Sequence, residues 1–99
     1  MNFDKDVFFK YLNEKDYVSC MDMLRQEIVH ALILRVKEKD PSFEYSTLGI
    51  LKIYCFKYLN RPEQEIACNL YDLDNEEISS SSTLSKMMEL YKQLVDINI

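Results

Sequence analysis

The sequence predicts an all-α fold: an up-and-down antiparallel bundle of four to five helices, in a single helical-bundle domain over residues 1–99. Three observations lead to this prediction. Apolar residues recur every three or four positions in five separate segments, which is the spacing of one helix face. One glycine and two prolines leave little material for the tight turns of β-hairpins. Hydrophobic residues make up 47% of the chain, which is typical of folded domains, and a chain of 99 residues can bury one modest core.

The first two segments are joined by a short link, so we expect antiparallel neighbours. Residues 3–13 have the spacing of an amphipathic helix. Asp16 is suited to cap a second helix, which we expect to run to about Lys39 because the residue before Pro41 is disfavoured in the α region. The middle of this helix, IVHALIL over residues 28–34, is apolar on nearly every side. Such a helix must be covered all round, so it is either the central helix or part of a subunit interface.

A loop at residues 41–45 separates the second helix from a third. Ser46 or Thr47 is suited to begin the third helix, whose apolar stripe ends near Leu59. Gly49 is unfavourable inside a helix, and we expect a close helix contact to account for it.

Two further helices complete the predicted bundle. Pro62 fits the first position of a fourth helix. The side chains expected to point inward from it are those of Ile66, Ala67, Leu70 and Leu73. After an acidic and serine-rich stretch, Ser82 or Thr83 can cap the last helix. Its expected apolar face comprises Leu84, Met87, Met88, Tyr91, Leu94 and Val95.

The composition also restricts the location and the cofactors of the protein. No apolar stretch reaches the roughly 18 to 20 residues of a membrane span, and acidic residues occur where a signal peptide is basic, so we expect a cytoplasmic protein without a membrane role. Cys20, Cys55 and Cys68 are odd in number and lack a C-x-x-C pair, which predicts buried thiols rather than disulfides. With a single histidine as well, we expect no metal and no cofactor.

The charges are distributed unevenly along the chain. The net charge is −5, but residues 35–61 have three more basic than acidic residues. Residues 62–85 contain six acidic residues and no lysine or arginine. Because contacts of lysine and arginine with phosphate supply most general affinity for nucleic acids, tight binding of RNA or DNA is disfavoured. The basic region is most simply a solvated helix rim.

The order of the segments carries a family resemblance. The stretches YVSCMDMLRQEIVHALILRVKEKD, STLGILKIYCFKYL and EQEIACNLYDLDNEEIS, followed by a last helix, resemble the HEPN superfamily of small helical bundles over nearly the whole chain. Many HEPN proteins are metal-independent ribonucleases, whose motif is an arginine, usually followed by asparagine or another polar residue, with a histidine four to six residues beyond. In this chemistry histidine moves protons near neutral pH, while arginine stabilises negative charge on the phosphate.

The resemblance places the catalytic motif of the family at residues 74–79, which read DNEEIS. Asn75 fits the motif, but Asp74 occupies the place of the arginine and Ser79 that of the histidine. This implies a degenerate site that has lost RNA cleavage. Two other interpretations remain: the stretch simply ends one helix and connects it to the next, or it is an acidic loop that binds a partner or a cation.

A second arginine and histidine occur together at Arg25 and His30, away from the position that the resemblance implies. On a regular helix, residues five apart are separated by roughly 140°, so these side chains do not share a face. They remain weak candidates for catalytic residues. For His30, a core or interface position is the simpler expectation, and for Arg25 it is an ion pair with Asp22.

These observations lead to three functional hypotheses. The first is a non-catalytic HEPN-like bundle that acts through protein contacts, as a homodimer or as the regulatory or antitoxin-like partner of another chain in a toxin–antitoxin pair. Its expected interface residues lie on the second helix and are Ile28, Val29, Ile33 and Val36. The second hypothesis is a metal-independent ribonuclease that uses Arg25 and His30. The third is an unrelated helical adaptor domain.

Overall fold

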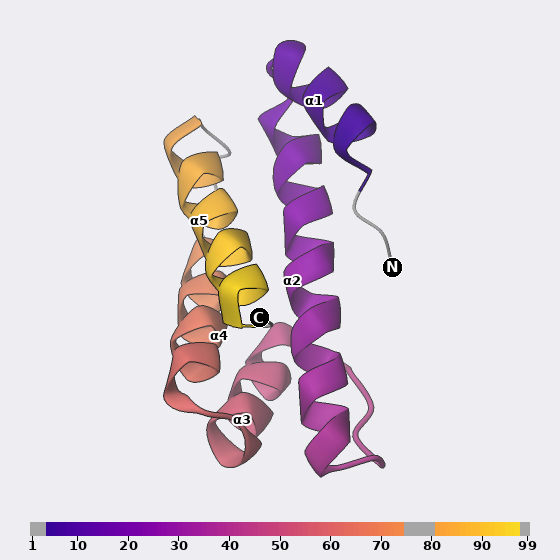
Figure 1. The fold of residues 1–99 in the computed structure, drawn as a ribbon, viewed down its shortest axis with the longest axis vertical. Helices are drawn as coiled ribbons and strands as arrows, with labels where there is room; N and C mark the ends of the chain where they lie inside the picture. Colours follow the sequence, from indigo (N-terminus) through magenta and orange to yellow (C-terminus); the bar gives the residue numbers. More distant parts are fainter. Residues whose placement is uncertain (1–3, 75–80, 98–99) are drawn as a thin grey trace.

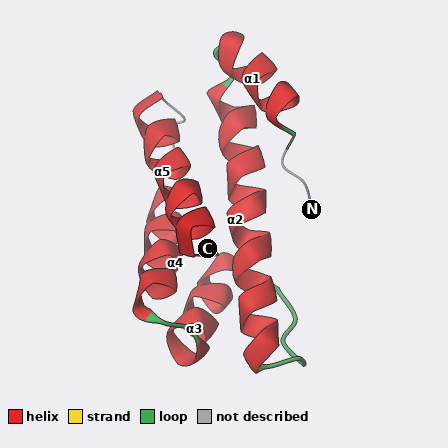
Figure 2. Ribbon diagram, in the orientation of Figure 1, coloured by secondary structure: helices red, strands yellow, loops and turns green. Residues whose placement is uncertain are grey.

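The computed structural model describes residues 4–74 and 81–97, and this part of the chain is helical and contains no strand (Figures 1 and 2). Its five helices are α1 (Lys5–Asn13), α2 (Tyr17–Lys39), α3 (Leu48–Tyr58), α4 (Arg61–Asp74) and α5 (Ser81–Ile97). The structure confirms the predicted all-α bundle. In the described ranges, no helix is both long enough and apolar enough to cross a membrane.

The longest helix, α2, is the centre of the arrangement. It contacts all four other helices, and α1 packs against α2 alone. Helix α3 also packs against α4, and α4 packs against α5, so α2, α3, α4 and α5 enclose a common core. In Figure 1, α1 lies at one end of α2 and α3 lies near the other.

Side-chain caps fix the beginnings of the first three helices. The Asp4 carboxylate accepts hydrogen bonds from the backbone amides of Asp6 and Val7. Asp16 accepts one from the backbone amide of Ser19 at 3.2 Å, which confirms it as the cap of α2. Thr47 accepts one from the amide of Ile50, also at 3.2 Å, and is therefore the cap of α3. Helix α2 ends at Lys39, as the proline at position 41 predicts.

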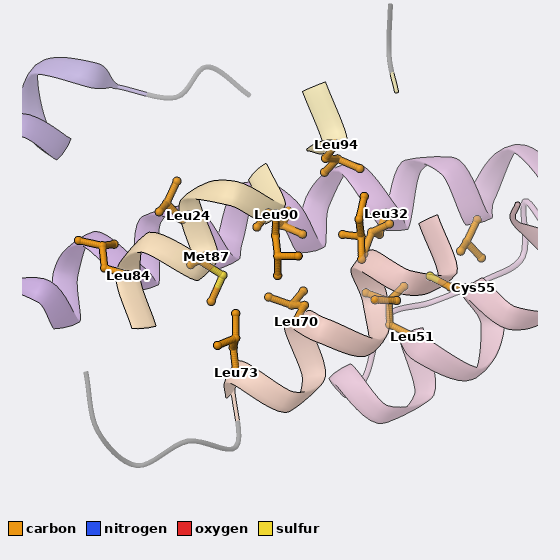
Figure 3. Packing of buried hydrophobic residues seen from close by; sticks show 14 of the residues in the cluster. Leu24, Leu32, Leu51, Cys55, Leu70, Leu73, Leu84, Met87, Leu90 and Leu94 are labelled. Carbon is orange, nitrogen blue, oxygen red and sulfur yellow. The ribbon is translucent and has the colours of Figure 1, made fainter. Parts of the chain in front are cut away.

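The core is mainly apolar and receives side chains from every helix, including Phe8 of α1. Figure 3 shows the packing of core residues from α2, α3, α4 and α5. The largest fully buried members of the core are Ile28, Leu32, Leu51, Ile66, Leu70 and Met87. All four residues predicted to point inward from α4 are buried. On α5, Met88 is 41% exposed, and Leu90 is buried instead. Helical geometry accounts for this difference. The buried residues Leu84, Met87 and Leu94 lie on one face of α5, and Met88 points roughly 90° away from the middle of that face.

Gly49 faces the side chain of Tyr71 on α4. A Cβ atom at Gly49 would lie 3.6 Å from Cε2 of Tyr71, which is an ordinary van der Waals distance. The glycine is thus beside a neighbouring helix, as expected, but the contact leaves room for a methyl group. A close approach of the two helices does not require glycine here.

Candidate functional site

Helix α3 has apolar side chains on two opposite sides. Eight of its eleven residues are hydrophobic. Leu51 and Cys55 on one side are fully buried in the core. On the other side Ile50, Ile53 and Phe56 are 40%, 61% and 50% exposed. These three side chains are called the outer face of α3 below.

The outer face is a continuous stripe rather than three scattered residues. Its members are spaced three positions apart, so each is displaced from the previous one by about 60° around the helix and about 4.5 Å along it. The stripe therefore extends for about 9 Å along α3 and has Ile53 at its centre. Single exposed apolar residues are normal on a protein surface, whereas a contiguous patch of large ones marks an interaction surface.

One lysine borders this stripe on each side, and each lysine contacts a neighbouring tyrosine ring. On the side of α4, the ammonium group of Lys52 lies 4.7 Å from the centre of the Tyr71 ring. On the side of the loop after α2, that of Lys57 lies 5.2 Å from the centre of the Tyr58 ring. Helix α3 itself contains no aspartate or glutamate. The outer face is consequently apolar along its middle and has one lysine of α3 along each edge.

Lys57 also affects the loop beside it. The pKa of Asp40 is lowered, mainly because the carboxylate accepts a 2.6 Å hydrogen bond from Oγ of Ser42. A longer hydrogen bond from the Tyr58 hydroxyl and the positive charge of Lys57 act in the same direction. Asp40 is thus an acceptor within its own loop, at the edge of the outer face.

A surface recess extends the outer face toward α4. It has a volume of about 540 Å³ and lies between Phe56 on α3 and the N-terminal half of α4. The connection between α3 and α4 is stabilised by Gln64, whose side-chain amide donates a 2.8 Å hydrogen bond to the carbonyl oxygen of Leu59. Arg61 and Glu65, one turn apart at the rim, form an exposed ion pair at 3.2 Å. Their charges offset each other, and Asp40 offsets part of the charge of Lys57, so Lys52 and Lys57 supply the positive charge that remains beside the apolar stripe.

The three thiols are free, and their surroundings differ. Burial, with help from the charges of Glu63 and Cys68, raises the pKa of Cys55 to about 12. Burial also raises the pKa of Cys20, and the charge of Asp16 adds to this effect. Cys68 is half-buried and lines the recess beside Phe56. The prediction of buried thiols is therefore confirmed for Cys20 and Cys55.

The structure gives no support to a shared catalytic site for Arg25 and His30. Both lie on α2, which is one uninterrupted helix, so they point in directions roughly 140° apart. The guanidinium group of Arg25 bonds to the carboxylate of Asp22 on the preceding turn, as expected. His30 is exposed, not in the core. Of the degenerate motif, Asp74 ends α4, and Asn75 and Ser79 lie outside the described residues.

The expected interface residues on α2 lie mainly against the chain's own core. Ile28 and Val36 are completely buried, while Val29 and Ile33 are half-buried and pack against the core. The four helices that contact α2 supply this cover. The large exposed apolar stripe is instead on α3. Helical periodicity in the sequence indicates this stripe, because Ile50, Ile53 and Phe56 lie on the side of α3 opposite the predicted inner stripe.

No family model, curated protein or solved structure matches this chain. The resemblance to the HEPN superfamily therefore stays a prediction. The functional argument depends on the geometry of the outer face of α3.

Proposed function

We propose that this chain is a non-catalytic helical bundle that acts by binding another protein through the outer face of α3. The observation that carries the proposal is the exposure of Ile50, Ile53 and Phe56 on a helix whose opposite side is already in the core. A contiguous group of large apolar side chains on the outer side of a helix is typical of an interaction surface. A partner seated on the outer face would bury these side chains.

The ribonuclease hypothesis has less support. It needs an arginine and a histidine at the same phosphate, whereas Arg25 and His30 leave a straight helix in different directions. In addition, the Asp22 carboxylate offsets the positive charge of Arg25 that would be needed to stabilise the phosphate. We expect the purified chain to leave single-stranded RNA intact, and His30→Ala to behave identically.

The family resemblance suggests a biological setting for the proposed binding. If the chain is HEPN-like and its motif is degenerate at Asp74 and Ser79, a regulatory or antitoxin-like role beside a second protein follows. The outer face of α3 would then be the surface that contacts this second protein. The binding proposal itself does not depend on the resemblance, and an unrelated adaptor would use the same face.

The test compares three forms of the full chain, recovered by an affinity tag from the cells that naturally produce it. These are the wild type, Ile53→Glu, and the matched control Leu34→Glu. Leu34 is 51% exposed on α2 and lies outside the outer face. We expect a defined protein to accompany the wild type and Leu34→Glu but to be lost with Ile53→Glu. Equal recovery with all three forms, or none with any, would contradict the proposal. Circular dichroism and urea denaturation establish that both variants are folded.

A further inference from the structure

We infer that the partner binds the outer face of α3 through an amphipathic helix that carries carboxylates on both sides of its apolar stripe. This inference rests on the proposed function and specifies the chemistry of the partner. Three features of the structure support it: the charge along the edges of the stripe, the lack of self-complementarity, and the form of the surface.

The charge pattern selects an acidic partner. Lys52 and Lys57 stand on opposite edges of the stripe, about 140° apart around α3. Each ammonium group lies over an aromatic ring, and this cation–π contact favours one position for its charge. A segment with glutamate or aspartate on both flanks would place opposite charges along both edges. Such complementarity steers association and excludes partners with the wrong charge.

The same pattern disfavours a second copy of this chain. In a symmetric dimer the same surface patch is used on both subunits. Two outer faces in contact would bring four lysines together, two from each copy, while the Asp40 carboxylate beside each Lys57 already accepts hydrogen bonds from Ser42 and Tyr58 of its own copy. Like charges placed against each other oppose association. The favoured occupant is therefore a different protein.

The form of the surface favours a helix as the occupant. The described ranges contain no strand, so they present no sheet edge to which an extended segment could add. The backbone groups of α3 are engaged within the helix, and only side chains face outward. A helix with apolar residues at i, i+3, i+4 and i+7 can pack along such a stripe. One of its large apolar side chains would enter the recess beside Phe56.

The probes are two labelled helical peptides of about 18 residues, or five turns. Both carry the same leucine stripe, flanked in one by glutamate and in the other by lysine. Fluorescence anisotropy measures their binding to the full chain. We expect the glutamate peptide to bind at least about tenfold more tightly, with the advantage declining at high salt. The chain has a net charge of −5, so non-specific electrostatic attraction would favour the lysine peptide. Tighter binding of the glutamate peptide would therefore indicate a specific contact with the lysines.

Variants of the chain locate the interaction. Lys52→Glu combined with Lys57→Glu should reverse the peptide preference, and Ile53→Glu should abolish binding of the glutamate peptide. The matched control is Lys37→Glu combined with Lys86→Glu, since both residues are exposed and lie on other helices. This control should keep the preference. Equal binding, a preference for the lysine peptide, or no binding of either peptide would overturn the inference.

Two further measurements separate this inference from the proposed function. Light scattering that reveals a dimer, lost in Ile53→Glu, would overturn the acidic partner, while the proposed role in protein binding would stand. Binding to vesicles of phosphatidylcholine and phosphatidylserine, lost in Ile53→Glu, would overturn both. We expect a monomer and no binding to vesicles.

Discussion

The ammonium group of Lys52 lies 4.7 Å from the centre of the Tyr71 ring and so links α3 to α4 at the edge of the outer face. Tyr71 also lies beside Gly49, one turn before Lys52 on α3. This pair therefore has two roles: it joins two helices and it holds one of the charges that border the apolar stripe.

The first prediction concerns the stability of this link. Lys52→Met removes the charge but keeps a long side chain over the ring, and it should lower the free energy of unfolding by about 0.5–1 kcal/mol. In a Tyr71→Leu background the same substitution should have almost no effect. Urea denaturation of the four forms of this double-mutant cycle measures the interaction. The same loss in both backgrounds would show that the cation and the ring do not interact.

The second prediction distinguishes the core from the outer face. Ile28 on α2 is completely buried, so Ile28→Ala should lower the free energy of unfolding by about 2–5 kcal/mol. Ile53 is mostly exposed, so Ile53→Ala should change it by less than about 0.5 kcal/mol. Comparable losses at the two positions would mean that Ile53 has an unrecognised role in folding.

The third prediction concerns Gly49. A methyl group fits beside Tyr71, and alanine is favoured over glycine within a helix by about 0.8–1.0 kcal/mol. Gly49→Ala should therefore raise the free energy of unfolding by about that amount. The urea midpoint of the variant tests this expectation directly. Destabilisation would show that α3 and α4 approach more closely than the structure indicates.

The fourth prediction concerns the thiols. At pH 8, with its pKa raised to about 12, Cys55 has about one thiolate in ten thousand molecules, so its reaction with a thiol reagent should be very slow. Half-buried Cys68 should react first, and Cys68→Ser should remove this fast phase. Denaturation should expose all three thiols. Rapid modification of Cys55 in the folded chain would contradict its burial.

The raised pKa of Cys55 also has a consequence for stability. The ordinary thiol value is 9.0, and folding disfavours the thiolate, so the contribution of Cys55 is fully present below about pH 9. It should decline as the pH rises from about 9 to about 12. Cys55→Ala should show a smaller loss of stability over this alkaline interval than the wild type does.

Much of the fold could be predicted from the sequence because its determinants are local. Asp16 caps α2 through a residue three positions away, and Pro41 determines where α2 ends. The inward positions of α4 follow from helical periodicity alone. Each of these features depends on residues within one or two turns of each other.

The candidate site could not be predicted in the same way because it depends on how the helices pack. The sequence marks both α2 and α3 as apolar on several sides. Which of the two keeps an exposed apolar stripe depends on the neighbours of each, and α2 contacts four helices while α3 contacts only α2 and α4. The sequence therefore leaves open whether Ile28 lies in the core or at an interface, and the structure places it in the core, whereas Ile53, which the sequence does not single out, is exposed.

Site-specific photo-cross-linking tests the central claim most directly. The photoreactive amino acid p-benzoylphenylalanine replaces Ile53 in the full chain, or Leu34 as the matched control, and cells that naturally produce the protein are irradiated. The account predicts one covalent adduct at position 53, larger than the chain alone, whose partner peptide is helical and acidic, and no such adduct at position 34. No adduct at position 53, or the same products at both positions, would contradict the claim that the outer face of α3 is a binding surface.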